Sequence, residues 1–581
     1  MVVDQGLSSP EQEEQGQRET INENAFVALR LYFVWKIGLS LVLFAATLFF
    51  AIATWHWQLV GDAPLLHYVI FLTQHGRVPY RDIVDPNMPG TYLVEWSVIH
   101  LFGSGALAWR IFDLGLMAVA TVCMVSICLP YDWFAGVFAG GLLTLIHGRD
   151  GLIQLGQRDL VMTVLLLASY MFLFSRLRER VSVSREAGQS MLFGICLGFA
   201  ASIQPTALLL APPLLVLSSV ALHRRRRAAK VHVIASVAGL AIPGIAILAY
   251  LLRMHAWAAF LDTVFRLAPY HLHLWSQKKS WLIFHTISSV TLPLVLLWLP
   301  VALRQKRWKT WEGAALYCGM AFGILSFIVQ AKGFPYHRYP SEAFLLLLSG
   351  VDFATVLRND VFTASMRLKV AAICGLGFGV FVIGVGSARL ALRYDWRDHE
   401  YDSMLQNDLR HLGGAQLSGQ IQCLDMASGC LDTLLGMSLV QSTGTLYDCY
   451  MLWPAKSPDE EYYRERFWRA IITKPPRVFV VNDKTCAPVT FDDGPYGKLA
   501  RWPKFAQYLA DNYILYADRV PPHRIWWARD PSRPVGYRIY VKKGTFCGTR
   551  KSPLRATKCR QPKASVPEAH YTSMWLAFHC R

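Results

Sequence analysis

Residues 224–252 read RRRRAAKVHVIASVAGLAIPGIAILAYLL, a basic cluster followed by a long apolar run. A helix needs about 20 apolar residues to cross the hydrocarbon core of a membrane, and the run 231–252 has that length. Similar runs recur between residues 33 and 391, and the whole chain is 53% hydrophobic and only 17% charged. This composition excludes a disordered or fibrous protein and predicts an integral membrane protein.

The position of the basic residues explains the formal net charge of +18 better than nucleic-acid binding does. Many of them lie in three short segments between apolar runs, 176–185, 224–230 and 304–309. Clusters of Lys and Arg in short loops stay on the cytoplasmic side of a membrane. With all three inside, the chain crosses eleven times and begins in the cytoplasm, so its C-terminal part lies outside. The expected spans are 33–53, 106–128, 134–147, 160–175, 191–203, 207–222, 231–252, 282–302, 313–331, 342–357 and 370–391.

The composition changes after residue 392, where charges become frequent and the apolar runs shorten to the length of strands. We expect strands near 421–424, 477–481, 513–516 and 537–541, and helices at 459–472 and 506–511, which together indicate a small α/β domain. Seven of the twelve cysteines lie in this part, as an oxidising compartment permits, and none has zinc spacing. The expected domains are a disordered cytoplasmic N-terminal tail (1–30), a transmembrane domain (31–392), a periplasmic α/β domain (393–541) and a basic C-terminal tail (542–581).

Polar residues gather in the loops that this topology places outside. The first loop, 54–105, predicts an interfacial helix capped by Asp62 and ending at Gly76, and a second one at 92–102. Ionisable residues at the membrane surface are costly, so they are candidates for function. The candidates are Asp62, Arg77, Arg81, Asp82 and Asp85 in the first loop, Arg158 and Asp159 before the fourth span, and Lys332, Tyr336, His337 and Arg338 after the ninth.

Several of these residues also have a purely structural interpretation. Asp62 and Asp159 could only cap helices, and Asp82 and Asp85 could only shape a proline-rich turn. Lys332 and Arg338 could be membrane anchors whose charged ends reach the interface. Two further patterns favour structure over chemistry: Arg110 and Asp113 are spaced to pair with each other, and His271 and His273 form only a weak metal signal.

Three stretches, taken in order, resemble the outer loops of polyprenyl-phosphate-sugar-dependent glycosyltransferases of the GT-C superfamily. They are GRVPYRDIVDPNMPG (76–90), GQRD (156–159) and KGFPYHRYP (332–340). The resemblance is strongest to glycosyltransferase family 39 and its bacterial relatives, which include protein O-mannosyltransferases and the aminoarabinose transferase acting on lipid A. The stretches 429–448, 475–483 and 537–543 resemble the outer domain of bacterial members, so the resemblance covers about residues 33 to 541.

The resemblance implies a polytopic GT-C-like fold of about 11 transmembrane helices, with a catalytic carboxylate in the first outer loop. Asp62 matches that carboxylate best, Asp82 is second, and Asp159 matches the aspartate that enters the fourth span. Lys332 resembles the family's lysine before a tyrosine-containing outer loop. Two departures separate this chain from the aminoarabinose branch: PNMPG lacks the lysine of the corresponding loop, and Gln204 stands where that branch often has lysine.

We therefore expect a membrane glycosyltransferase that moves a hexosyl or pentosyl group from a polyprenyl-phosphate donor to a glycan, lipid or protein acceptor. The predicted location is the bacterial inner membrane, in the cell envelope, with the reaction on the extracytoplasmic face. In this hypothesis Asp62, Asp82 and Asp159 are the catalytic candidates. The substrate would be held by Arg77, Arg81, Asp85, Arg158, Lys332, Tyr336, His337 and Arg338.

The sequence leaves two matters open. No cofactor is certain, and a divalent cation is possible because several carboxylates face one cleft, although no ligand set is legible. Membrane lipids are expected partners and nucleic acid is not. The alternative function is a multi-span transporter or lipid flippase with a periplasmic domain. We disfavour it because no convincing internal repeat is present and the charges gather in the outer loops rather than in the middle of spans.

Overall fold

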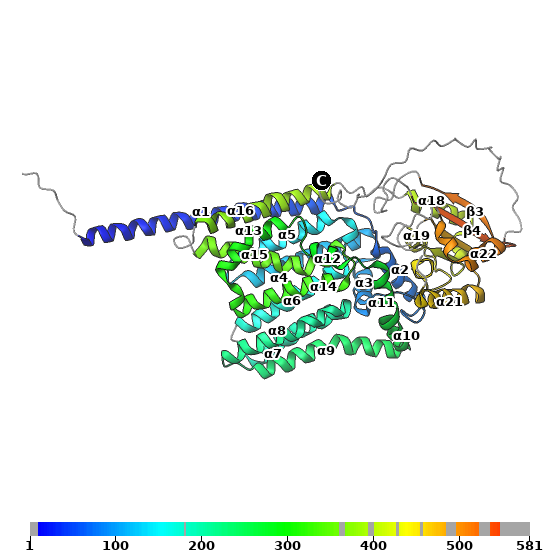
Figure 1. The fold of residues 1–581 in the computed structure, drawn as a ribbon, viewed down its shortest axis with the longest axis horizontal. Coiled ribbons are helices and arrows are strands. Elements are labelled where there is room, and N and C mark those ends of the chain that lie inside the picture. Colours follow the sequence, from blue (N-terminus) through cyan, green and yellow to red (C-terminus); the bar gives the residue numbers. More distant parts are fainter. Residues whose placement is uncertain are drawn as a thin grey trace, which may run out of the picture.

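The computed structural model describes residues 10–178, 182–359, 366–392, 400–425, 429–453, 457–483, 496–521 and 535–545, with side chains from Tyr32 onward. Long helices run side by side, and a small sheet lies beyond one end of them (Figure 1). This arrangement confirms the expected class, a helical membrane bundle with a small C-terminal α/β domain. The expected basic tail lies outside the described residues from 546 onward.

The bundle contains a helical segment for each of the eleven expected spans. They are α1 (Pro10–Ala53), α4 (Ala106–Cys128), α5 (Trp133–Asp150), α6 (Arg158–Arg178), α7 (Val183–Ile203), η2 with α8 (Pro205–Leu210, Ala211–Arg224), α9 (Ala229–Arg253), α13 (Leu292–Gln305), α14 (Trp311–Gln330), α15 (Tyr339–Asn359), and α16, η6 and α17 (Met366–Gly377, Phe378–Val385, Gly386–Ala391). Among the described residues, nine helices are long and apolar enough to cross a membrane. The eighteen-residue α5 and the shorter α13 complete the set.

Two expected boundaries differ from the structure. The span expected at 282–302 is divided into the short α12 (Lys279–Phe284) and α13, because Pro293 cannot continue a helix from the preceding residues and fits the first turn of a new one. The segment expected to be a disordered tail lies largely within α1, which begins at Pro10. That segment is rich in Glu, Gln and Arg, which have high helix propensity.

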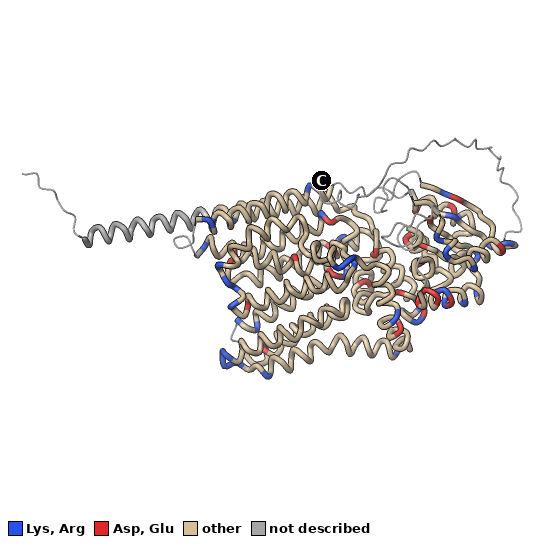
Figure 2. Tube along the Cα trace, viewed as in Figure 1, with Lys and Arg blue, Asp and Glu red and all other residues tan. Residues whose placement is uncertain are grey.

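One end of the bundle carries most of its Lys and Arg residues (Figure 2). The loops after α6 and α8 meet there, because Arg225 donates a hydrogen bond to the Leu177 carbonyl oxygen at 2.6 Å. Glu186 joins the same loops by pairing with Arg176 at 3.0 Å and with Arg227. The basic segments 176–185 and 224–230 therefore lie on one side, as the charge pattern predicts.

The opposite end is built from short helices that lie between the bundle and the sheet (Figure 1). They are α2 (Asp62–Gln74), α3 (Pro89–Phe102), η1 (Leu152–Gln154), α10 (Trp257–Asp262), η3 (Thr263–Leu267), α11 (Ala268–Trp275) and η5 (Pro335–Arg338). Gly76 follows α2 with φ of 84°, which is the expected helix end. The expected second interfacial helix is α3, which begins earlier, at Pro89.

The C-terminal domain contains a four-stranded sheet of order β1-β2-β4-β3. Strands β1 and β2 are parallel, and the other two pairs are antiparallel. All four expected strands and both expected helices are present. The strands are β1 (Ile421–Leu424), β2 (Val478–Asn482), β3 (Tyr513–Arg519) and β4 (Tyr537–Lys542); the helices are α18 (Glu400–His411), η7 (Gly414–Leu417), α19 (Cys430–Gly436), α20 (Cys449–Leu452), α21 (Pro458–Thr473), η8 (Gly497–Arg501) and α22 (Pro503–Asn512).

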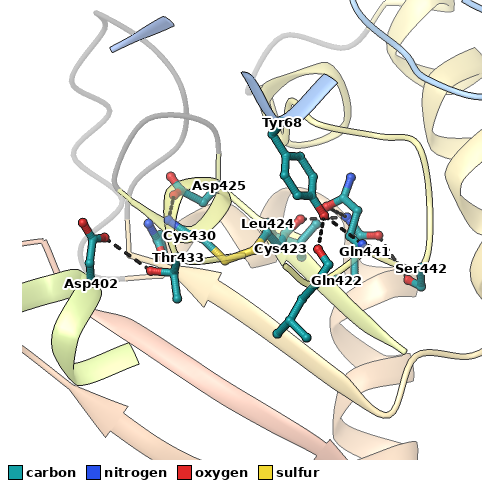
Figure 3. The surroundings of a disulfide bond; sticks show 12 residues. Tyr68, Asp402, Gln422, Cys423, Leu424, Asp425, Cys430, Thr433, Gln441 and Ser442 are labelled. Atoms are coloured by element: carbon teal, nitrogen blue, oxygen red, sulfur yellow. Dashed lines mark hydrogen bonds between the residues drawn. A yellow bond between two sulfur atoms is a disulfide. The ribbon is translucent and has the colours of Figure 1, made fainter. Parts of the chain in front are cut away.

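The segment 437–448 joins this domain to the first outer loop. The Tyr68 hydroxyl donates to the Leu439 carbonyl oxygen and accepts from the Gln441 N–H, both at 2.8 Å (Figure 3). Arg77 donates to the carbonyl oxygens of Gln441 and Ser442 at 2.7 and 3.1 Å. A disulfide between Cys423 and Cys430 holds β1 to α19 beside this contact (Figure 3). The outer loop and the domain thus share one hydrophobic core.

Gly444 makes the closest backbone approach in this contact. Its carbonyl oxygen accepts from the Val84 N–H at 2.8 Å, and a Cβ atom at this position would lie 1.6 Å from the Asp82 carbonyl oxygen. We expect Gly444→Ala to separate the loop from the domain, lower the thermal unfolding temperature in detergent and expose segment 437–448 to protease. Gly436→Ala, in α19 of the same domain, is the matched control, because its Cβ would meet its nearest neighbour at an ordinary 3.5 Å. Equal behaviour of the two variants would contradict this account.

Candidate functional site

Asp62 lies at the start of α2, at the end of the bundle that carries the C-terminal domain. Gly61, with φ of 69°, is the N-cap of the helix, and no side-chain hydrogen bond caps it. The expectation that Asp62 caps α2 is therefore wrong, because the preceding glycine makes the turn. Arg158 Nη2 lies 3.6 Å from Asp62 Oδ2, and the two side chains are 22% and 32% exposed. The carboxylate is thus paired with a cation but still accessible to a ligand.

Asp159 is buried beside this pair, on the first turn of α6. Its Oδ1 accepts a hydrogen bond from Gln330 Nε2 at 2.7 Å. The Gln330 Oε1 atom in turn accepts from Gln204 Nε2, also at 2.7 Å. These amides connect the end of α14 and the turn after α7 to the start of α6. Asp159 is therefore held in a fixed orientation rather than being free to move.

Lys332 contributes a cation whose charge depends on pH near neutrality. Its Nζ lies 2.9 Å from His271 Nε2, and His271 Nδ1 lies 3.0 Å from the Tyr450 hydroxyl. Burial lowers the pKa of Lys332 to about 7, helped by the charge of Arg158 and opposed by Asp62, Asp159 and Asp85. Burial also holds the pKa of His271 well below its ordinary value, so the ring is neutral and can accept from the ammonium group.

Asp85 is fully buried and holds the loop between α2 and α3 in place. Its Oδ1 accepts from the Tyr92 hydroxyl and the Asn87 N–H, both at 2.7 Å, and its Oδ2 accepts from the Tyr447 hydroxyl at 3.3 Å. Burial raises the pKa of this carboxyl, although the hydrogen bonds from Asn87 and Tyr92 and the charge of Arg158 oppose the shift. Tyr447 belongs to the C-terminal domain, so that domain contributes directly to the surroundings of the site.

Tyr336, His337 and Arg338 form the buried turn η5 next to Lys332. The Tyr336 hydroxyl interacts with Arg158. Arg338 Nε lies 3.6 Å from Glu342 Oε1, so its charge is directed toward α15. Of these three expected substrate-binding residues, Tyr336 is joined most directly to the Asp62 cluster, which we define as Asp62, Asp85, Arg158, Asp159, Lys332 and Tyr336.

Arg77, Arg81 and Asp82 take part in other contacts. Asp82 Oδ2 accepts from the Val78 N–H and from Arg81 Nη2, both at 2.8 Å, which is the turn-shaping role considered from the sequence. Arg77 is occupied by the backbone carbonyl oxygens of the C-terminal domain. None of the contacts in the described part of the chain joins these three residues to the Asp62 cluster.

Two buried ion pairs near the site have structural roles. Arg110 Nη1 donates to Asp113 Oδ2 at 2.6 Å, which confirms the pairing expected from their spacing. Asp113 Oδ1 also receives hydrogen bonds from His147 Nε2 and the Gly156 N–H, both at 2.9 Å. Removing one partner of such a buried pair costs about 3–5 kcal/mol. This network therefore anchors the loop that delivers Arg158 and Asp159.

The second pair, His67 with Glu95, lies between α2 and α3. His67 Nδ1 is 3.2 Å from Glu95 Oε2, and both side chains are almost fully buried. Burial raises the pKa of the Glu95 carboxyl, while His67 and the charge of Arg158 oppose it. The pair thus joins α2 to α3 next to the start of α2.

Sequence reasoning missed several residues of the site. Gln330 carries no charge and lies at a helix end, so its pattern gives no signal, and the resemblance marks Gln204 only as a departure from the lysine of the aminoarabinose branch. The HLH motif around His271 favours a structural role, although His271 contacts Lys332. Tyr447 and Tyr450 are separated from the cluster by more than 100 residues of chain, and no local motif marks them.

Metal binding finds no support in the site as described. Within the described residues, no group of three or more His, Cys, Asp or Glu side chains is arranged to hold a metal ion. The carboxylates of the site are instead occupied by Arg158, Gln330 and tyrosine hydroxyls.

Solved structures resemble this fold. ArnT from Cupriavidus metallidurans bound to undecaprenyl phosphate matches with a TM-score of 0.51 and 12% identity, over 89% of this chain and 99% of that one. The Archaeoglobus fulgidus oligosaccharyltransferase tethered with an acceptor peptide matches with a TM-score of 0.45 and 11% identity, over 87% of this chain and 74% of that one. No family model and no curated protein matches the chain. The expected resemblance is thus confirmed at the level of the GT-C fold.

The charges around Lys332 predict how its pKa responds to substitution. Arg158→Gln removes a positive charge and should raise the pKa of Lys332 above about 7, whereas Asp62→Asn removes a negative charge and should lower it. The measurement is the pH dependence of Lys332 acetylation, followed by mass spectrometry, with the exposed Lys279 as a reference for reagent reactivity. Shifts in the same direction for both variants would show that these two side chains do not act on Lys332.

Proposed function

We propose that this GT-C-fold membrane protein is a glycosyltransferase that moves a sugar from a polyprenyl-phosphate donor to an acceptor hydroxyl. The observation that carries the proposal is the Asp62–Arg158 pair, an accessible carboxylate beside a fixed cation, with Lys332 adjacent. The ArnT structure with the same fold binds undecaprenyl phosphate, which supports a lipid phosphate as the donor's carrier. A transporter has no comparable support, because the charges lie at the end of the bundle rather than midway along it.

The chemistry needs one base and a group that stabilises a leaving phosphate. Asp62 accepts the proton of the acceptor hydroxyl while the oxygen of that hydroxyl forms a bond to the anomeric carbon of the donor sugar. The bond between that carbon and the phosphate oxygen breaks, and the electron pair stays on the phosphate. Arg158 and protonated Lys332 neutralise the charge that develops there. Attack on the face opposite the phosphate inverts the configuration of the anomeric carbon.

The other residues position these groups. Asp159, held by Gln330, fixes the start of α6 and with it Arg158. Asp85 holds the first outer loop through Tyr92 and Tyr447. Tyr336 orients Arg158, and His337 and Arg338 line the turn beside Lys332. Asp82 acts in the turn with Arg81 rather than as the base.

The proposed sugar is a hexose or a pentose, and the proposed acceptor is a glycan, a lipid or a protein. The orientation has its own support. The basic loops gather at the end opposite the site, and such loops stay in the cytoplasm. The disulfide between Cys423 and Cys430 fits an oxidising compartment. We therefore place the site and the C-terminal domain on the extracytoplasmic face of a bacterial inner membrane.

The assignment of Asp62 as the base predicts the effect of one substitution. Asp62→Asn should lower the transfer rate by about 10²–10⁴-fold, because the amide cannot accept the hydroxyl proton. The assay follows label from a panel of polyprenyl-phosphate hexoses and pentoses into membrane lipids, glycans and proteins. The matched control is Asp518→Asn, which should keep the wild-type rate. Asp518 lies on β3 of the C-terminal sheet, in an exposed pair with Arg538 on β4. Wild-type transfer by a folded Asp62→Asn protein would remove Asp62 from the mechanism.

The orientation predicts which side a label reaches. A cysteine placed at Arg226, in the loop after α8, should be protected from an impermeant maleimide in intact spheroplasts. A cysteine placed at Lys543, after β4, should react. Both positions are exposed, so the difference reports the membrane side rather than burial. Reaction at both positions, or only at position 226, would contradict the orientation.

A further inference from the structure

A groove separate from the Asp62 cluster lies between α10 and α21. It has a volume of about 580 Å³, which is within the usual range of ligand pockets, about 300–1,000 Å³. Three arginines line it, together with two alanines, a tyrosine and one aspartate. The lining residues are Arg81, Ala258, Ala259, Asp262, Tyr462, Arg466 and Arg469.

The charges of this groove do not balance internally. Arg81 is paired with Asp82 at 2.8 Å, and Asp262 is engaged by Arg266 at 3.2 Å and by the Tyr462 hydroxyl at 3.3 Å. Arg466 is different, because among the described residues no carboxylate pairs with it. Arg469 has only an exposed partner one helical turn away, Glu465 at 3.7 Å. Positive charge is therefore left over in the groove.

Arg466 is also held in a defined orientation. Its Nη2 donates to the carbonyl oxygens of Tyr80 and Arg81, at 3.3 and 3.1 Å. The side chain is half-buried, and its bonds within the described part of the chain are these two from Nη2. A guanidinium group that is fixed in this way binds a phosphate with little further loss of side-chain entropy.

The groove lies at the level where the bundle leaves the membrane. Arg81 Nη1 donates to the carbonyl oxygen of Met254, directly after the end of α9. Only 17% of the most apolar stretch of α9 is buried inside the protein, so this helix faces lipid. Trp257 and Phe265, beside the groove, are 38% and 76% exposed. Exposed aromatic residues at a helix end are typical of the lipid–water interface.

We propose that this groove, which we call the Arg466 groove, binds the phosphate headgroup of an anionic membrane lipid. Arg466 and Arg469 contact the phosphate oxygens, and the acyl chains lie along α9. No bond forms or breaks in this binding. The site is distinct from the one in which sugar transfer is proposed, and its existence does not depend on that activity.

The groove is connected to the Asp62 cluster through one loop. Arg466 holds the backbone of Tyr80. The Tyr80 hydroxyl donates to the Asn87 carbonyl oxygen at 2.8 Å, and its ring packs on Tyr92, which donates to Asp85. A lipid phosphate bound to Arg466 therefore stabilises the loop that positions Asp85.

The test is lipid retention by the full-length protein. Purified protein is placed in nanodiscs that contain equal amounts of phosphatidylglycerol and phosphatidylcholine. The protein is then released from the nanodiscs, and native mass spectrometry weighs it together with the lipids that stay bound. Wild type should retain phosphatidylglycerol preferentially, and Arg466→Gln with Arg469→Gln should lower that preference about tenfold, the scale of a lost charge-assisted contact. Ala258→Trp, which fills the groove and leaves its charges in place, should have the same effect. Arg410→Gln, on the exposed face of α18, is the matched control and should retain wild-type preference.

Each outcome decides the proposal. Unchanged preference in the Ala258→Trp protein would overturn it, because charge elsewhere on the surface would then explain the retention. Displacement of the lipid by millimolar inorganic phosphate would overturn the lipid as the source of the phosphate and assign the groove to a soluble anion. Should the double variant unfold, Arg469→Gln alone tests the charge, since the contact of Arg469 in the described part of the chain is with Glu465 of its own helix.

Discussion

The structure depends on one constraint: a charge inside the bundle must have a partner, because the surrounding lipid offers none. Lys36 pairs with Asp132, and Arg307 pairs with Asp352 at 2.7 Å, with Trp298 completing the acceptor's hydrogen bonds. These pairs lock helices together near the basic end. The polar groups of the site lie at the other end of the bundle, where the short outer helices and the C-terminal domain cover them. Sorting of charge along the bundle therefore decides where a polar site can form.

The C-terminal domain is part of that site rather than an appendage. Tyr447 and Tyr450 reach Asp85 and His271, and Tyr68 of α2 is bonded to the backbone of segment 437–448. The shared core between the outer loop and the domain makes this contact rigid. A consequence is that the loop carrying Asp85 has neighbours on both sides, from the bundle and from the domain. Contacts on both sides fix the conformation of this loop, as a preorganised site requires.

The Asp62 cluster brings charges of both signs together. Arg158 and Lys332 lie close enough for their charges to repel, and the carboxylates of Asp62, Asp159 and Asp85 offset that repulsion only in part. Burial, with this repulsion added to it, lowers the pKa of Lys332 to about 7. An arriving phosphate would favour the protonated ammonium group, so ligand binding and proton uptake are coupled at this position.

The amino-acid sequence by itself determined the features that depend on local composition. The lengths of the apolar runs predicted all eleven spans, although the structure divides the one at 282–302. Shorter apolar runs, such as 477–481, predicted the strands of the sheet, because hydrophobic burial acts on whole segments of chain. Charge and position in the outer loops also made Asp62, Arg158, Asp159 and Lys332 candidates for the site. Tertiary structure alone decided which candidates meet: it turned Arg77 to a backbone contact and Arg81 to the Arg466 groove, and it brought His271, Gln330 and Tyr447 to the cluster. These contacts join residues far apart in the chain, and a hydrogen bond depends on positions in space that no local pattern encodes.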